Sequence, residues 1–324
     1  MSKVNSIKLV GDSTSYLSCF GNADMPNLAF KLADISSEGA LLTDPFEYEA
    51  RESFALSSSS SDQYSHIVAE PEHKWADFIA EQSIENDATY IFAPREDMFP
   101  EMHREILKAQ VVQKTQYVNF YEQHNRKTGM IRYFEVQTGN WFGGISLIMW
   151  QAQKLLQTKD PEDLVSLTQL KGLFDKLSQR TVTYSIMSMT ELNSWSHQQI
   201  VHDSLIDRIG GTLAKDKWVT HQMSKDDIQI IEKGDLTHLI DQIFITLMML
   251  IERKALAFNR IIISCTHAQL DMLKETLAFQ QIDQMQEYWK YRWVHQVPSI
   301  TSQILTGKSA IHISCANSEL VAAE

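Results

Sequence analysis

Cysteine is scarce in this sequence. Cys19, Cys265 and Cys315 are the three cysteines among 324 residues, an odd number with no close pair. A disulfide framework needs paired cysteines and a thiolate metal site needs clustered ones, so the sequence argues against both. Reduced cysteines suit the cytoplasm, and the amino-terminal MSKVNS lacks the apolar core of a signal peptide. We therefore expect a cytoplasmic protein.

Basic residues are also fewer than acidic residues. The chain has 29 lysines and arginines against 41 aspartates and glutamates, which gives a formal net charge of −12. A protein that binds nucleic acid needs a basic surface to neutralise phosphates, so we expect no nucleic-acid partner. Attraction to anionic lipid surfaces is not expected either, for the same reason.

No hydrophobic run is long enough to cross a membrane. The most apolar stretch, His238–Ile251, contains Asp241 and falls well short of the ~20 apolar residues of a spanning helix. We interpret it as a buried helix and expect no transmembrane segment.

What the sequence does contain is ordinary for a globular protein, with 44% hydrophobic and 22% charged residues. The length favours two domains. Asp160-Pro161-Glu162-Asp163 is typical of a helix start, with an N-cap aspartate followed by proline and acids. We place the domain boundary just before it, which gives domains at 1–158 and 159–324.

The first half alternates predicted strands with predicted helices. Alternation of this kind implies parallel pairing with helical crossovers, so we expect an N-terminal α/β domain with a mainly parallel sheet flanked by helices. The expected strands are Ile7–Val10, Ala88–Ala93, Gln116–Tyr121 and Met130–Val136.

The second half has a hairpin pattern. Lys217–Met223 and Ile228–Glu232 flank the turn-rich SKDD, so this α/β domain should have a partly antiparallel sheet. Asp235 is expected to cap an apolar helix that runs through Phe258. The other expected elements are strands at Thr181–Met187, Arg260–Ser264, Tyr291–Val297 and Ala310–Ser314, a helix at Ala268–Phe279 and a polar loop at Ser299–Ser309.

The small polar residues after the first strand are the first candidate binding site. Ligands of open α/β sheets bind beyond the carboxyl ends of strands, which is where Asp12–Ser15 falls. Gly139, Gly143 and Gly144 mark a second strand-to-helix junction. They permit either a ligand near a helix N-terminus or close packing of the helix on a sheet.

Two further interpretations stay open. Ser13 could be the nucleophile of a hydrolase with a remote histidine, although no GxSxG motif is present. The methionines and aromatics of the apolar helices could line a lipid tunnel, although such residues more often form plain core. They are Met149, Trp150, Phe244, Met248 and Met249.

The order of these pieces resembles the DegV family of bacterial fatty-acid-binding proteins. The motifs are Asp12-Ser13-Thr14 after the first strand, Glu135 and Gly143-Gly144 at the strand–helix junction, Thr190-Glu191-Leu192, the hairpin, and Thr306-Gly307 before the last strand. The resemblance spans nearly the whole chain.

The resemblance implies two α/β domains that hold a fatty acid between them, with no enzymatic activity and no cofactor. Its acyl chain would lie in an apolar tunnel. Its carboxylate would be hydrogen-bonded by Ser13 in the first loop, with Thr14 beside it, and by Thr306 and the Gly307 amide in the closing loop. A fatty acid kinase-like protein would be the partner to which the lipid is presented.

The sequence departs from the family at several positions. REDMFP at Arg95–Pro100 replaces a Ser-Gly-Thr stretch, Leu305 replaces a histidine, and Lys308-Ser309 replaces Pro-Gly. A buried carboxylate needs donors. Either Arg95 or Lys308 therefore serves as a cationic anchor, or the ligand is different or neutral, or ligand binding is lost and the chain is a regulatory interaction module.

Overall fold

The computed structural model describes residues 6–16, 27–37, 40–56, 66–67, 72–94, 100–126, 132–158, 166–188 and 218–321. The expected anchor Arg95, the predicted helix start at Asp160–Asp163 and the Thr190-Glu191-Leu192 motif lie outside these residues. The domain boundary after residue 158 stays a prediction.

The first sheet is parallel throughout. Its strands are β1 (Ile7–Asp12), β2 (Leu28–Lys31), β6 (Ala88–Ala93) and β7 (Arg132–Gln137). They lie in the order β2-β1-β6-β7, and every neighbouring pair is parallel. All six residues of β6 are buried, as expected for a central strand with helices on both faces.

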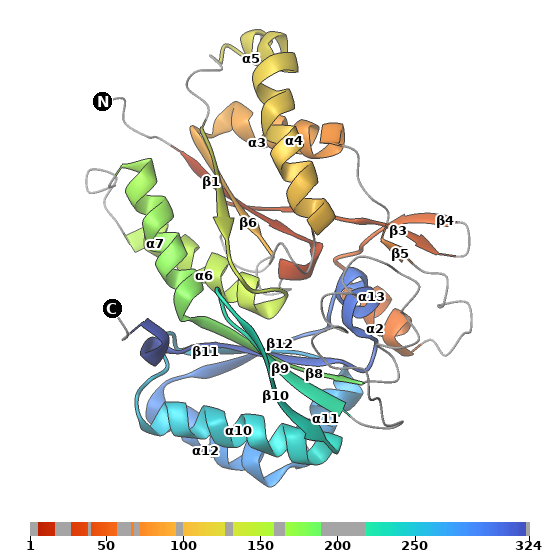
Figure 1. The fold of residues 1–324 in the computed structure, drawn as a ribbon, viewed down its shortest axis with the longest axis vertical. Coiled ribbons are helices and arrows are strands. Elements are labelled where there is room, and N and C mark those ends of the chain that lie inside the picture. The colour runs from red at the N-terminus through yellow and green to blue at the C-terminus, as the bar shows by residue number, and fades with distance from the viewer. Residues whose placement is uncertain are drawn as a thin grey trace.

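Helices cover both faces of this sheet (Figure 1). Successive residues of a strand point to opposite faces. Val10 and Ile91 pack with α3 and α4, whereas Leu9 and Tyr90 pack with α6 and α7. The helices are α3 (Glu72–Glu85), α4 (Pro100–Gln116), α5 (Val118–Gln123), α6 (Gly143–Thr158) and α7 (Leu167–Arg180).

The strand expected at Gln116–Tyr121 is wrong, because α4 ends there and α5 follows. In a helix Tyr117, Phe120 and Tyr121 share one face. Tyr121 is buried against Ala80, and its hydroxyl contacts that of Tyr133 at 2.7 Å. Packing on α3 therefore overrides the strand preference of these aromatic residues.

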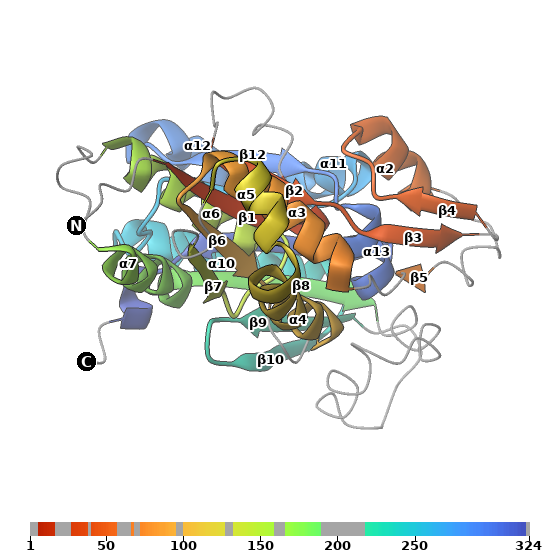
Figure 2. The same cartoon turned by 90° about the horizontal axis from the view of Figure 1, so that it is seen from above.

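A small antiparallel sheet and a helix project from the first domain. They were not predicted from the sequence. The strands β3 (Asp34–Ser37), β4 (Ala40–Thr43) and β5 (His66–Ile67) lie in the order β4-β3-β5, and α2 (Tyr48–Leu56) follows β4. Figure 2 shows these elements projecting to one side, next to α13 (Ile300–Thr306).

The second sheet has six strands in the order β10-β9-β8-β13-β11-β12. Only the β11–β12 pair is parallel among these, and β9 and β10 form the predicted hairpin. The expected α/β fold, with one parallel and one partly antiparallel sheet, is confirmed. The bounds are Thr181–Ser188 (β8), Trp218–Met223 (β9), Ile228–Gly234 (β10), Arg260–Ser264 (β11), Arg292–Gln296 (β12) and Ile311–Ala316 (β13).

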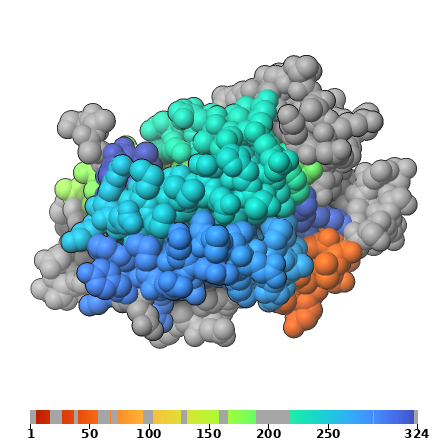
Figure 3. Space-filling view, turned by 90° about the horizontal axis from the view of Figure 1, so that it is seen from below, coloured from red at the N-terminus to blue at the C-terminus, as the bar shows by residue number. Residues whose placement is uncertain are grey.

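Three helices cover the outer face of the second sheet, namely α10 (Leu236–Glu252), α11 (His267–Glu275) and α12 (Leu277–Trp289). The space-filling view from below shows α10 and α12 side by side on that face (Figure 3). A short 3-10 helix, η4 (Ser318–Val321), ends the described chain. No helix of the described residues is long and apolar enough to cross a membrane.

Several predicted boundaries in the second half are wrong. The apolar helix α10 ends at Glu252 and not at Phe258, and Asp235 is its N-cap residue without a side-chain cap. Thr276 divides Ala268–Phe279 into two helices, because its hydroxyl caps α12. Within the described residues α7 begins at Leu167, after a capping box between Ser166 and Gln169. The helix start predicted at Asp160–Asp163 is not tested, because it lies outside these residues.

The polar segment Ser299–Ser309 is not only a loop, because it contains α13. Ser299 caps this helix by accepting a hydrogen bond from the Ser302 amide at 3.0 Å. The Asp44 carboxylate, far away in the sequence, accepts from the Ile300 and Thr301 amides at 3.1 and 3.0 Å. A helix that is capped partly from a distant segment has little local signal.

Helix α6 lies between the two sheets and contacts β1 and β6 of one and β8, β11 and β13 of the other (Figure 1). A Cβ on Gly143 would lie 2.9 Å from Ile262, and a Cβ on Gly144 would lie 2.4 Å from the Thr183 hydroxyl. Close helix–sheet packing therefore accounts for both glycines.

Candidate functional site

The turn η1 (Ser13–Ser15) follows β1 at the carboxyl edge of the parallel sheet, and it is held by Asp12. Asp12 Oδ1 accepts hydrogen bonds from the Thr14 and Ser15 amides, both at 3.1 Å, and from the Thr14 hydroxyl at 2.7 Å. Asp12 Oδ2 is buried without a partner. Burial raises the pKa of Asp12, against the hydrogen bonds from Thr14 and Ser15, which lower it.

Ser13 is buried in this turn and accepts a hydrogen bond from the Ala33 amide at 2.8 Å. Its own proton has no acceptor among the described residues, so it can be donated to a ligand. No described histidine is hydrogen-bonded to Ser13, which leaves a hydrolytic role without a base in this arrangement. Thr14 already donates its proton to Asp12.

The closing-loop residues Thr306 and Gly307 lie at the end of α13. Thr306 donates its hydroxyl proton to the Ser302 carbonyl at 2.9 Å, and the Gly307 amide donates to the Gln303 carbonyl at 3.0 Å. Gly307 has φ 93°, a conformation that favours glycine. Both protons that the sequence analysis assigned to a ligand are thus donated within α13, and their role in binding stays a prediction.

The structure brings the first and the closing loop together. α13 contacts both η1 and α2. Ile35, Ile300 and Ile304 form an apolar cluster against which Phe54 packs, and Lys308 Nζ lies 4.3 Å from the centroid of the Phe54 ring. Ser13, Thr14, Thr306, Gly307 and Lys308 therefore belong to one region, although they come from opposite ends of the chain.

The sequence analysis missed Arg51, a buried arginine of α2 in the same region. Its side chain is 3% exposed, and Nε donates to the Pro45 carbonyl at 2.7 Å. The guanidinium lies 5.6 Å from the ring centroid of Tyr16, which directly follows η1. Nη2 is buried and has no partner among the described residues.

Arg51 is a cation in an environment that disfavours charge. Burial lowers the pKa of Arg51, and the attraction of Asp44 opposes that shift. An arginine in a protein nevertheless stays protonated. Nothing in the local sequence marks Arg51 as buried, because α2 has little apolar pattern and Arg51 is its one buried side chain.

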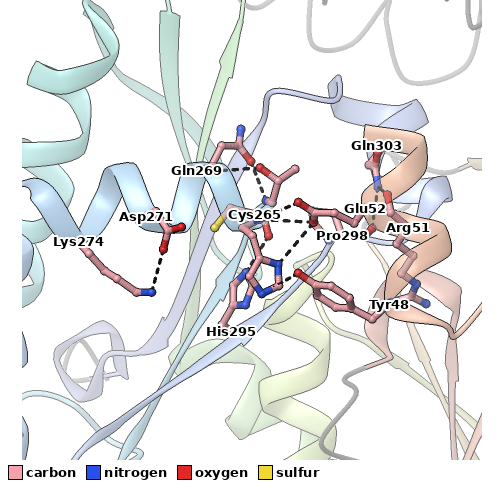
Figure 4. Close-up of polar contacts among 12 residues, drawn as sticks. Tyr48, Arg51, Glu52, Cys265, Gln269, Asp271, Lys274, His295, Pro298 and Gln303 are labelled. Atoms are coloured by element: carbon pink, nitrogen blue, oxygen red, sulfur yellow. Dashed lines mark hydrogen bonds and ion pairs between the residues drawn. The ribbon is translucent and has the colours of Figure 1, made fainter. Parts of the chain in front are cut away.

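Helix α2 is tied to the second domain at two places (Figure 4). Gln303 of α13 donates to the Arg51 carbonyl at 3.0 Å. At the start of α11, the His267 amide donates to Glu52 Oε1 at 3.1 Å, and the His267 ring nitrogen Nε2 lies 2.7 Å from the Tyr48 hydroxyl. These contacts hold Arg51 in place next to η1 and α13.

The face of the second sheet toward α6 carries buried histidines. His312 of β13 contacts the Ser185 hydroxyl through Nδ1 at 2.8 Å and the Thr306 hydroxyl through Nε2 at 3.2 Å. Burial lowers the pKa of His312 to about 3, so its ring is neutral and a poor base. His221 of β9 is also buried, and neither of its ring nitrogens has a partner among the residues that the structure describes.

The candidate tunnel residues do not gather around one space. Met149 packs in the core of the parallel sheet and Phe244 in the core beneath the second sheet. Met248 is partly buried against that second core, Met249 is 43% exposed, and Trp150 lies under the Arg260 guanidinium. In this structure they are core and surface residues. No group of metal-ligating side chains is found among the described residues.

Solved structures share this fold. DegV from Bacillus subtilis, described as a fatty acid binding protein, gives a TM-score of 0.69 at 12% identity, with 96% of this chain and 99% of that chain covered. A DegV family protein from Eubacterium eligens loaded with heptadecanoic acid gives 0.64 at 14% identity, covering 96% and 100%. The fatty acid kinase (Fak) B3 protein of Streptococcus pneumoniae, loaded with linoleic acid, gives 0.66 at 10% identity, covering 96% and 99%.

No protein-family model matches the chain, and no curated protein matches it in sequence. The likeness to the solved structures, at 14% identity or less, is therefore one of fold. It covers nearly the whole of each chain. The resemblance inferred from the sequence motifs is confirmed at this level, and the chain has the two-domain fold of the DegV family.

Proposed function

We propose that this protein binds a long-chain fatty acid or a related anionic lipid between its two domains and catalyses no reaction. The observation that carries the proposal is Arg51, a buried cation whose Nη2 has no partner among the described residues, next to the hydroxyl-bearing turn after β1. The names of the structural neighbours, which describe fatty acid binding, support the same ligand class.

A ligand carboxylate would supply a hydrogen-bond acceptor for Arg51 Nη2, beside the attraction that Asp44 already provides. A buried charge without a partner is costly, and the cost falls when an opposite charge with good hydrogen bonds is brought in. Guanidinium groups bind carboxylates through two parallel hydrogen bonds. Ser13, with its free hydroxyl proton, is the second proposed donor. Arg51 thus takes the anchoring role for which the sequence analysis offered Arg95 or Lys308.

The test compares octadecanoic acid with octadecanol, which has the same chain without the charge. We expect the wild-type protein to prefer the acid and the Arg51→Met variant to lose that preference. Loss of one partner of a buried charge pair costs about 2–5 kcal/mol, so affinity for the acid should fall roughly 30-fold or more. Arg253→Gln, at an exposed arginine that ends α10, is the matched control and should bind as the wild type does.

Lipid extraction followed by mass spectrometry provides an independent check. We expect an acyl chain to co-purify with the wild-type protein and to be depleted from Arg51→Met. Absence of any co-purifying lipid, together with no thermal shift on addition of octadecanoic acid, would contradict the proposal. Turnover of an ester that survives Ser13→Ala would exclude Ser13 as the nucleophile of a hydrolase, and it would also contradict the proposal that the protein catalyses no reaction.

We further propose that the lipid is presented to a fatty acid kinase-like partner in the cytoplasm. The motive is the shared fold with a fatty acid kinase component. The alternative is a regulatory module that has kept the fold and a docking surface but has altered or lost ligand binding. The internal use of the Thr306 and Gly307 protons favours it. Capture of a kinase by lipid-free protein, with no acid binding, would select this alternative.

A further inference from the structure

A row of buried polar side chains crosses the second sheet on the face toward α6. Direct cross-strand partners point to the same face of a sheet. The register pairs Ser264 with His312, His312 with Ser185 and Ser185 with His221, on four neighbouring strands. All of these side chains are buried. Buried polar side chains thus form a row across four neighbouring strands on this face.

His221 is the member of this row that has no hydrogen bond. His312 and Ser185 contact each other, whereas neither ring nitrogen of His221 has a partner within the part of the chain that the structure describes, and the residue is 1% exposed. Burial, with a smaller effect of Lys233, lowers the pKa of His221 to about 4, so its ring is neutral. A neutral imidazole offers one donor and one acceptor. Leaving both unmade costs about 1–3 kcal/mol per group.

Apolar residues flank His221 along β9, and their cluster contains a second donor that has no partner among the described residues. Val219 and Met223 lie on the same face of β9 on either side of His221, and both pack in one cluster with Trp141 and Met187. The indole Nε1 of Trp141 is buried and likewise has no partner in the described ranges. Trp141 thus packs with the two residues that flank His221 on the same face of β9.

We propose that the lipid carries a hydroxyl or carbonyl group on its hydrocarbon chain, and that His221 and Trp141 bind this group. The inference rests on the proposed lipid-binding function. The polar row places His221 relative to α13. Thr306 of α13 contacts His312, and His221 lies two strands farther across the sheet, on the order of 10 Å away. Arg51 lies on α2, which contacts α13. We therefore infer that His221, two strands beyond His312, faces the chain of the ligand instead of its carboxylate.

The experiment measures binding of octadecanoic acid and of mid-chain monohydroxy octadecanoic acids, by displacement of a fluorescent fatty acid. We expect the wild-type protein to prefer at least one hydroxy acid by roughly tenfold, the worth of one well-made hydrogen bond. His221→Leu should reduce this ratio to about one. His221→Gln, which keeps a donor and an acceptor, should retain part of it.

Thr220→Val is the matched control. Thr220 is the neighbour of His221 on the same strand, is equally buried, and also has an unpartnered side-chain oxygen, but it points to the opposite face. Removing either unpaired group should raise the melting temperature of the ligand-free protein. Only His221→Leu should change the ratio of the two affinities.

The outcomes separate this inference from the proposed function. Equal binding of plain and hydroxylated acids by the wild-type protein, or an unchanged ratio in His221→Leu, would overturn the inference and leave the fatty acid proposal standing. Binding of neither acid would overturn both. A lower melting temperature for His221→Leu would show that the ring is a packing element, and this too would count against a ligand role.

Discussion

Arg51 and His221 illustrate at the scale of single residues how burial sets chemistry. Both are polar, both are almost fully buried, and both have nitrogen atoms without a partner. Their charge states differ, because an arginine keeps its proton and a buried histidine gives it up. The first is therefore suited to an anion, and the second to an uncharged group with a donor and an acceptor.

The neutral histidines make stability fall in acid. Burial lowers the pKa of His221 to about 4 and of His312 to about 3, from an ordinary value of 6.5. Above pH 6.5 both rings are neutral in either state. Below it the unfolded chain takes up the proton first, so each ring lowers the free energy of unfolding by about 1.4 kcal/mol per pH unit. Asp12 and Asp44, whose pKa values burial raises, act in the opposite direction.

A comparison of variants separates the contribution of His221 to the pH dependence of stability from the contributions of the carboxyl groups. We expect the stability gain of His221→Leu over the wild type to grow by about 1.4 kcal/mol per pH unit as the pH falls from 6.5 toward 4. The gain of Thr220→Val should not change with pH. Urea denaturation at several pH values measures both, and parallel profiles for the wild type and His221→Leu would contradict a neutral buried ring.

Sequence patterns predict elements well where their cause is local. The alternation of strands and helices predicted β1, β6 and β7, and the SKDD turn predicted the β9–β10 hairpin. α13 escaped prediction because part of its cap, Asp44, lies 256 positions away in the sequence. The small β3–β5 sheet escaped because its strands are short and have no strong period.

The same distinction applies to the candidate site. Ser13 and Thr14 were found because small polar residues after a first strand are a local signal. Arg51 was not, because its burial depends on Tyr16, Asp44 and the docking of α2 on α13. The sequence around His221 does not indicate a buried ring without a hydrogen bond either, because that state depends on strand register and on the packing of α6 against the sheet.

At the scale of elements, the packing of α6 on the second sheet can be tested with a pair of glycines. A Cβ at Gly144 would lie 2.4 Å from Thr183 Oγ1 and 2.8 Å from Asn140 Oδ1, in the narrow contact between helix and sheet. Gly144→Ala should therefore lower the free energy of unfolding by about 1–3 kcal/mol. Gly172→Ala, within α7, meets no atom within 4 Å and should raise it by about 0.5–1 kcal/mol.

If this packing is correct, urea denaturation shows changes of opposite sign in the free energy of unfolding of the two alanine variants. Equal effects at Gly144 and Gly172 would contradict it. The result also bears on function, because a helix that is pushed away from the sheet would move Trp141 and Phe142, which directly precede α6 and lie 6.1 and 4.5 Å from the His312 ring.

At the scale of the whole molecule, helix α2 belongs to the segment that projects from the first domain, and it contacts the second domain. α2 contacts α13 through Arg51 and Gln303, and it contacts the start of α11 through Glu52, Tyr48 and His267. Figure 3 shows α2 at the edge of the second domain, next to the region of α11. The proposed anchor for the ligand is thus carried by a helix of one domain and held by the other.

This arrangement predicts that ligand release depends on the contact between Glu52 and α11. Glu52→Ala removes the acceptor of the His267 amide, so α2 should separate from α11 more often and carry Arg51 with it. We expect dissociation of octadecanoic acid to become up to roughly tenfold faster, with amide exchange in residues 48–56 increased. Glu49→Ala, at an exposed position of the same helix, controls for the loss of a carboxylate. Equal dissociation rates for the two variants would mean that this contact does not hold the ligand, and that Arg51 is positioned by Asp44 and α13 alone.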